Sequence, residues 1–133
     1  MEYPGYSVYQ SKEISEEKII LDAERVMEHL VETCKVPLEQ IIIMGRSLGS
    51  GPACYVSTKY SVRGLILVSP FTSIKELAGE HYGLFGRLLI KDRFNNLSNI
   101  KKAQCPVLII HGDSDELVPL SHAEALQSRS ILL

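Results

Sequence analysis

The chain has 133 residues, with 14 Lys and Arg against 16 Asp and Glu and a formal net charge of −2. This length is typical of one domain, and a composition of 45% hydrophobic and 23% charged residues is typical of a globular protein. The near-neutral charge argues against a nucleic-acid binder, because such proteins carry clustered basic faces. The densest basic cluster here is only the pair Lys101-Lys102.

No apolar run approaches the roughly 20 residues that cross a bilayer, so we expect no transmembrane segment in this chain. Its first residues, MEYPGY, lack the basic start and apolar stretch of a secretory signal. Cys34, Cys54 and Cys105 are odd in number and far apart along the chain. This spacing predicts reduced core cysteines in a cytoplasmic protein, rather than disulfides or metal ligands.

Helical and strand patterns alternate along the first half of the chain. Apolar residues recur at steps of three and four between Ser15 and Lys35, which predicts an amphipathic helix capped by Ser15. The β-branched run at residues 40–44 predicts a fully buried strand of a parallel sheet. A short helix of small residues at 51–59 and a second buried strand at 64–68 are expected to follow.

The second half is less regular. Pro and Gly interrupt the apolar pieces between residues 69 and 99, so we expect a lid-like insertion at about 70–99, over one end of the sheet. Residues 106–110 predict a third strand, and Ser121 is expected to cap a last helix that ends near Ser128. The alternation predicts one α/β domain over residues 1–133, a parallel sheet with flanking helices on both faces.

The most informative segment runs from a predicted strand through Gly45-Arg46-Ser47-Leu48-Gly49 into a predicted helix. This order is a nucleophile elbow, a sharp turn that lifts a serine hydroxyl out of the sheet, and its two glycines leave room for the turn. The Leu48 N–H and the positive end of the following helix are expected to face a developing oxyanion. The competing interpretation, a phosphate-binding loop, requires Lys and then Ser or Thr after the last glycine, and that spacing is absent.

A second polar cluster follows the predicted strand at residues 106–110 and includes Asp113 and Asp115. Functional groups of open parallel sheets lie past the carboxyl ends of their strands. An acid that follows the serine along the chain also fits the triad order Ser, Asp, His. An aspartate in such a turn is by itself more commonly a turn former or a helix cap, so only its pairing with Ser47 favours the catalytic interpretation of Asp115.

Four segments carry a family resemblance: Tyr3-Pro4-Gly5-Tyr6, Gly45 through Ala53, Ser69-Pro70-Phe71-Thr72-Ser73, and His111-Gly112 with Asp115-Glu116 and Val118-Pro119. Together they resemble the α/β-hydrolase superfamily, in particular the α/β-hydrolase domain-containing 17 and 13 type of serine hydrolase. The resemblance implies a partial α/β-hydrolase fold with Ser47 as the nucleophile, Asp115 as the triad acid and Leu48 as one oxyanion donor. The first subgroup removes palmitate from protein cysteines, which implies an acyl ester or thioester substrate, including lipidated protein.

A serine hydroxyl needs a base, and the resemblance places the catalytic histidine a few tens of residues after the acid, past one more strand. None of the four histidines occupies that place: His29, His81, His111 and His122. Each βαβ unit takes about 30 residues or more, so the chain holds about half of a hydrolase sheet. We therefore expect a domain truncated at both ends, with residues 130–133 starting a further strand. We also expect negligible turnover by this chain alone, and self-association through exposed sheet edges.

The leading hypothesis is a serine hydrolase of acyl esters or thioesters, in which Phe71, Leu117 and Val118 line an apolar groove for a fatty chain. Protein depalmitoylation rests on the resemblance alone. The alternative is a catalytically dead hydrolase-fold protein that acts as a binding or scaffold module. No cofactor or metal is implied, because the serine mechanism needs none and no metal-ligand spacing occurs. The acyl chain, the partner protein and a membrane anchor in the full-length protein stay open.

Overall fold

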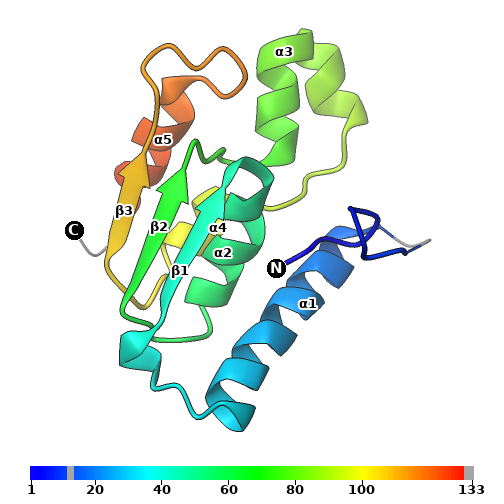
Figure 1. Cartoon of the computed structure of the whole chain (residues 1–133). Coiled ribbons are helices and arrows are strands. Elements are labelled where there is room, and N and C mark those ends of the chain that lie inside the picture. The colour runs from blue at the N-terminus through cyan, green and yellow to red at the C-terminus, as the bar shows by residue number, and fades with distance from the viewer. Residues whose placement is uncertain (12–13, 131–133) are drawn as a thin grey trace.

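Three parallel strands form one sheet in the order β1-β2-β3 in the computed structural model, which describes residues 1–11 and 14–130 (Figure 1). The strands are β1 (Ile42–Arg46), β2 (Gly64–Val68) and β3 (Val107–Ile110). Gly45 of β1 lies opposite Leu67 of β2, which in turn lies opposite Ile109 of β3. Because all three strands are parallel, their carboxyl ends meet at one edge, at the top of Figure 1. The α/β fold class and the three predicted strands are confirmed, with ends shifted by at most two residues.

The helices follow the predicted order. They are α1 (Glu16–Glu28), extended by a π-helical turn (His29–Thr33), α2 (Ser50–Ser57), α3 (Ile74–Leu89), α4 (Asn96–Ile100) and α5 (Leu120–Gln127), with short 3₁₀ turns at Leu38–Gln40 and Ser47–Gly49. Ser15 caps α1 as expected, since its side chain accepts a hydrogen bond from the Lys18 N–H. The expected cap of the last helix is wrong. Pro119 precedes α5, and Ser121 lies inside its first turn.

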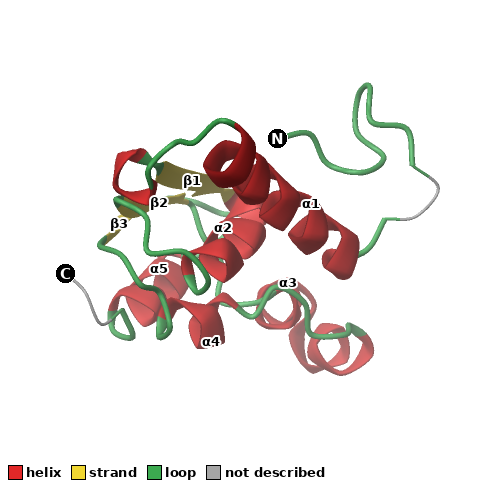
Figure 2. Ribbon diagram, turned by 90° about the horizontal axis from the view of Figure 1, so that it is seen from below, coloured by secondary structure: helices red, strands yellow, loops and turns green. Residues whose placement is uncertain are grey.

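The core lies between the sheet and one layer of helices (Figure 2). Leu65 and Leu67 of β2 are almost completely buried and pack with Cys54 and Val56 of α2 and with Ile100 of α4. The helix α1 packs on α2. Burial of these apolar side chains is the main source of stability for such a layered arrangement.

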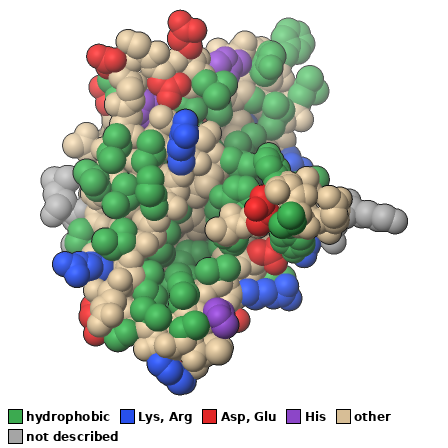
Figure 3. Space-filling view, in the orientation of Figure 1, with side chains coloured by type: hydrophobic (Ala, Val, Ile, Leu, Met, Phe, Trp, Pro, Cys, Tyr) green, Lys and Arg blue, Asp and Glu red, His purple; other side chains and the backbone are tan. Residues whose placement is uncertain are grey.

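The opposite face of the sheet is bare in the part of the chain that the structure describes. Ile42, Met44, Leu108 and Ile110 point to this face and are 49% to 66% exposed. Figure 3 shows hydrophobic side chains gathered over the strands on this side. The prediction of helices on both faces is therefore wrong for the described residues, and so is the prediction that residues 40–44 are fully buried. The continuous apolar pattern of the strands is typical of a sheet that is covered on both faces, but the described helices cover only one face.

The cysteines divide into two groups. Cys54 and Cys105 are buried as predicted, and burial raises the pKa of both thiols, so they stay protonated and act as packing residues. Cys34 is exposed, beyond the π-helical turn that ends the first helix, so the prediction of a core position was wrong for this residue. Among the described residues no helix is long and apolar enough to cross a bilayer.

We predict that the bare face makes the isolated chain self-associate. Changing Met44 and Leu108 to lysine together places charges on this face without touching the helix layer, and is expected to shift the chain to a monomer in size-exclusion chromatography with light scattering. The matched control changes Val8 and Leu21, which are also exposed, to lysine and is expected to leave the apparent mass unchanged. Equal dissociation by both double variants would show that net charge, not this face, controls assembly.

Candidate active site

Ser47 occupies the turn between β1 and α2. Its φ is +48°, in the left-handed region that non-glycine residues rarely adopt. The strand ends at Arg46, the 3₁₀ turn Ser47–Gly49 follows, and α2 begins directly at Ser50. A conformation of this kind costs on the order of 1–3 kcal/mol and persists only where the surroundings hold it.

Close packing around the glycines supplies that constraint. A Cβ added at Gly45 would lie 2.6 Å from the Cβ of Ala53 and would also collide with the carbonyl of Gly49. A Cβ added at Gly49 would lie 2.9 Å from the hydroxyl oxygen of Tyr3. The helix α2 therefore rests directly on β1, as the spacing of the glycines predicted. The segment around Tyr3 also reaches the same turn.

Asp115 lies in the loop after β3. Its Oδ1 accepts hydrogen bonds from the N–H groups of Val118 at 2.9 Å and Leu117 at 3.0 Å. The Val118 N–H and then the Ser69 hydroxyl are the main causes that hold the pKa of the Asp115 carboxyl below its usual range. The carboxylate is therefore ionised at neutral pH, as orienting an imidazole requires.

Ser47 and Asp115 lie at the same edge of the sheet, because they follow the carboxyl ends of parallel strands. One strand, β2, separates β1 from β3, so the two strand axes are about 10 Å apart at the usual strand spacing. Ser69 follows β2 between them. Its φ is +45° and its N–H donates to the carbonyl of Ile110 at 2.8 Å.

Leu48 follows the serine, in the 3₁₀ turn directly before α2. Its side chain packs against a small buried cluster of Ile19, Phe71, Phe94 and Val118. This packing fixes the peptide that carries the Leu48 N–H. Its role as an oxyanion donor stays a prediction.

The three residues expected to line a fatty-chain groove do not form one. Phe71 and Val118 are 1% and 2% exposed and belong to the buried cluster that supports Leu48, whereas Leu117 is 65% exposed. The sequence places all three near the site, but alternation along the loop sends the Val118 side chain inward and that of Leu117 outward. In this structure only Leu117 is accessible to a ligand.

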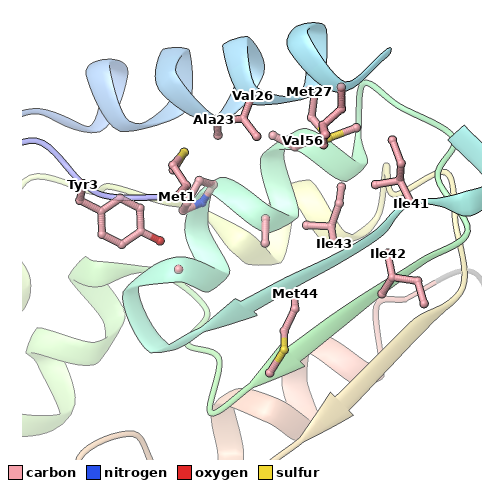
Figure 4. A pocket seen from close by; sticks show the side chains of 14 residues that line it. Met1, Tyr3, Ala23, Val26, Met27, Ile41, Ile42, Ile43, Met44 and Val56 are labelled. Carbon is pink, nitrogen blue, oxygen red and sulfur yellow. The ribbon is translucent and has the colours of Figure 1, made fainter. Parts of the chain in front are cut away.

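An apolar groove of about 390 Å³ does occur beside β1 (Figure 4). Its walls come from Ala23, Val26 and Met27 of α1 and from Ile43 and Met44 of β1, and one end reaches Gly49 and Tyr3 at the serine turn. It runs along the edge of β1 away from β2, which no strand of the described residues pairs with.

The four histidines are all engaged elsewhere. The Nε2 atoms of His81 and His111 lie 2.7 Å from the carbonyl oxygens of Leu117 and Val118. His111 Nε2 is also 3.8 Å from Asp115 Oδ2, and His29 Nε2 is 3.5 Å from the Sγ of Cys34.

His122 is buried, and its Nδ1 accepts a hydrogen bond from the Thr72 N–H at 3.1 Å, with the Thr72 hydroxyl at 2.8 Å. The expectation of surface or packing histidines therefore agrees with their contacts, and His122 is a packing residue. Because the Thr72 N–H is a donor only, the Nδ1 atom of His122 that accepts from it must be unprotonated.

Sequence reasoning missed one polar link at the base of the turn. The Asn96 side chain is completely buried and donates to the hydroxyl of Ser50 at 3.0 Å and to the carbonyl of Phe71 at 2.9 Å. It joins the segment 70–99 to Ser50, the first residue of α2. No pattern around Asn96 distinguishes it from the neighbouring Asn95, which caps α4.

The chain is similar to known proteins in both sequence and fold. No protein-family model matches the chain. In sequence it is 33% identical over 128 residues to human alpha/beta hydrolase domain-containing protein 17B, which covers 96% of this chain and 43% of that protein. The 17C protein of Xenopus tropicalis is also 33% identical, over 96% of this chain and 40% of that protein.

The fold has counterparts among solved structures. An alpha-beta hydrolase from Vibrio vulnificus superposes with a TM-score of 0.73 at 20% identity, covering 90% of this chain and 48% of that one. An alpha-beta serine hydrolase homologue from Coxiella burnetii gives 0.68 at 21% identity, over 98% of this chain and 52% of that one. The chain has a partial α/β-hydrolase fold and is similar in sequence to the domain-containing 17 proteins.

The chain spans less than half the length of the curated relatives reported above. The fold it shows is correspondingly partial, with three strands in the described residues. No group of three or more His, Cys, Asp or Glu residues in the described part is placed to hold a metal ion.

Replacing Gly45 by alanine is expected to destabilise the folded chain by about 1–3 kcal/mol, because the new methyl group meets backbone atoms and Ala53 rather than a movable side-chain end. The measurement is the free energy of unfolding in urea. Gly112→Ala is the control, since the nearest atom to its Cβ would be 4.0 Å away. Equal losses in the two variants would contradict a tight contact at Gly45.

Stability is also expected to fall in mild acid. Burial lowers the pKa of His122, although Glu80 and Glu76 oppose the shift. The unfolded chain protonates this histidine near pH 6.5, whereas the folded chain does so only at lower pH. The contribution of neutral His122 to the free energy of unfolding is therefore complete above about pH 6.5. As the pH falls below this value, the contribution is lost by up to about 1.4 kcal/mol per pH unit.

The measurement is the urea unfolding midpoint at pH 7.5 and pH 5.5, compared with that of His122→Asn. The asparagine oxygen can accept the Thr72 N–H but does not titrate, so the variant should show a smaller pH dependence. An unchanged dependence would assign the acid sensitivity to other groups.

Proposed function

We propose that this chain is the nucleophile-bearing part of a serine hydrolase that cleaves acyl esters and thioesters. The proposal depends chiefly on Ser47, held at a φ of +48° between β1 and α2. An ordinary turn at this place would be less strained with glycine, so a constrained serine is what supports a nucleophile here. The domain-containing 17 relatives support the same class, since they are named as hydrolases.

In the proposed reaction the Ser47 Oγ attacks the acyl carbonyl carbon and its proton passes to a base. The Leu48 N–H and the positive end of α2 stabilise the oxyanion that forms. The thiol or alcohol then leaves with the proton from the base, and water releases the acid from the acyl-enzyme. Asp115 is proposed to orient the base and to stabilise its positive charge. This role is supported by the lowered pKa of its carboxyl group.

The base is the group that the described residues do not supply. Each of the four histidines contacts a partner other than Ser47, and none follows Asp115 in a loop after a further strand. Loss of the base of such a triad costs on the order of 10⁶ in turnover. We therefore propose that the 133 residues alone turn over substrate negligibly and that a longer protein of this family carries the activity.

The proposed substrate class is supported by apolar surfaces near the serine turn and by the resemblance to the domain-containing 17 subgroup. An accessible Leu117 and an apolar groove that reaches Gly49 favour a substrate with an apolar acyl chain. Removal of fatty acyl groups from cytoplasmic proteins is proposed from the resemblance to the domain-containing 17 subgroup alone.

A catalytically inactive binding or scaffold protein is the second candidate. The engagement of all four histidines favours it, because a hydrolase fold without a base can still bind an acyl group at the same edge. The two candidates differ in whether Ser47 is nucleophilic.

Labelling with a fluorophosphonate probe distinguishes them. In the full-length gene product Ser47 is expected to be labelled, and Ser47→Ala is expected to abolish labelling, whereas Ser114→Ala, in the neighbouring loop, is not. The 133-residue chain is expected to hydrolyse a palmitoyl thioester no faster than its Ser47→Ala variant. Absence of labelling under conditions that label a control hydrolase would support the scaffold function instead.

A further inference from the structure

The helix α3 is a closed helical hairpin rather than one straight helix. Gly83 has a φ of +62° and a ψ of −151°, which breaks α3 into two pieces that fold back on each other. A Cβ added at Gly86 would lie 2.5 Å from the carbonyl oxygen of Ala78. Arg87 also forms a salt bridge to Glu76 at 2.9 Å, across the two pieces. The hairpin is therefore tightly packed along its inner side.

Its outer side is apolar and exposed. The outer patch consists of Tyr82, Leu84, Phe85, Leu88 and Leu89, which are 71% to 82% exposed. Positions 84, 85, 88 and 89 fall on one stripe of a helix. An amphipathic helix normally turns such a stripe toward the core. Here Gly86 and Arg87 instead face the other piece of the hairpin, and the apolar stripe faces outward. Figure 3 shows hydrophobic side chains projecting at the upper right, over α3.

The hairpin projects from the edge of the sheet that holds the serine turn (Figure 1). His81 Nε2 of the hairpin lies 2.7 Å from the Leu117 carbonyl oxygen in the loop after β3. At the base of the hairpin the Ile74 N–H donates to the carbonyl of Arg93 at 3.0 Å, which joins the start of α3 to the segment that follows it. Side chains that are more than 70% exposed on a projecting hairpin form a convex surface. Such a surface inserts into a soft apolar medium more readily than it encloses a small ligand.

Basic residues lie within and just after the outer patch in the sequence. From Leu84 to Arg93 the sequence contains three cations, Arg87, Lys91 and Arg93, and one acid, Asp92. Backbone and Ser15 hydrogen bonds chiefly lower the pKa of the Glu17 carboxyl, and Lys91 and Arg93 add to this effect, so these two cations lie at the base of the hairpin, near the start of α1. An apolar tip with cations at its base complements an anionic bilayer, in which acyl chains lie beneath negatively charged headgroups.

We propose that the outer patch of α3 inserts into the surface of an anionic phospholipid bilayer. Its side chains carry only one hydrogen-bonding group, the phenol of Tyr82, and phenols favour the interfacial region of a membrane. The outer patch does not include Ser47 or Asp115, and membrane insertion of the patch does not require hydrolytic activity. Insertion would orient the edge of the sheet that carries the serine turn toward the membrane.

A single tryptophan tests insertion directly, because the chain contains none. Phe85→Trp is expected to show a blue-shifted emission when vesicles of phosphatidylcholine and phosphatidylserine are added. Brominated lipids should quench this emission. Val8→Trp, a control at another exposed apolar position, is expected to show neither effect. Unchanged emission of Phe85→Trp with these vesicles would overturn the proposal.

Co-sedimentation with the same vesicles tests the energetic role of the patch. Changing Phe85 and Leu89 together to glutamate is expected to weaken binding by at least about tenfold, because it removes apolar surface and adds repulsive charge. The control double variant changes Val8 and Leu21 to glutamate and adds the same charge elsewhere. It should retain most of the binding, and vesicles of phosphatidylcholine alone should bind the native chain more weakly.

Equal loss in both glutamate variants would reduce the interaction to net charge and overturn the proposal. So would a patch variant that keeps full vesicle binding but loses self-association in light scattering, because the outer patch would then face a second copy. Neither readout involves catalysis, so failure of the membrane proposal and failure of the hydrolase proposal are separate results.

Discussion

The contact between α2 and β1 at Gly45 is the constraint on which the candidate site depends. Only at a glycine can the carbonyl of Gly49 and the methyl group of Ala53 approach the strand so closely. This approach leaves no space for the turn to relax, and Ser47 is consequently held at a positive φ. Local strain at a functional position is thus balanced by packing that extends into the main core.

Buried polar contacts connect the segment 70–99 to this turn. Asn96 links Ser50 to the carbonyl of Phe71, and His122 of α5 binds Thr72. Because buried polar groups that lose their partner are costly, these contacts fix the two ends of the segment, while the hairpin of α3 between them projects outward. The fixed ends adjoin the serine turn.

At the sheet, the described residues leave two apolar surfaces without a partner, the bare face and the groove beside β1. Both include residues of β1, whose apolar run Ile42-Ile43-Met44 is typical of the middle of a two-sided sheet. The share of the relatives that this chain matches, 40% to 43%, fits a sheet that shows three strands.

The sequence by itself determined the alternation of strands and helices, the parallel sheet and the strained serine turn. These follow from local rules, namely apolar periodicity and the need for glycine at Gly45 and Gly49, and they also placed Ser47 and Asp115 at one edge of the sheet. Only the tertiary structure decided which surfaces are covered. It showed that Phe71 and Val118 are core residues, that Ile42 and Met44 face outward, and that Asn96 is a buried link. Burial depends on which elements, distant in sequence, pack together. The periodicity of apolar residues gives the direction in which a side chain points, but it does not give the element that packs against that side chain.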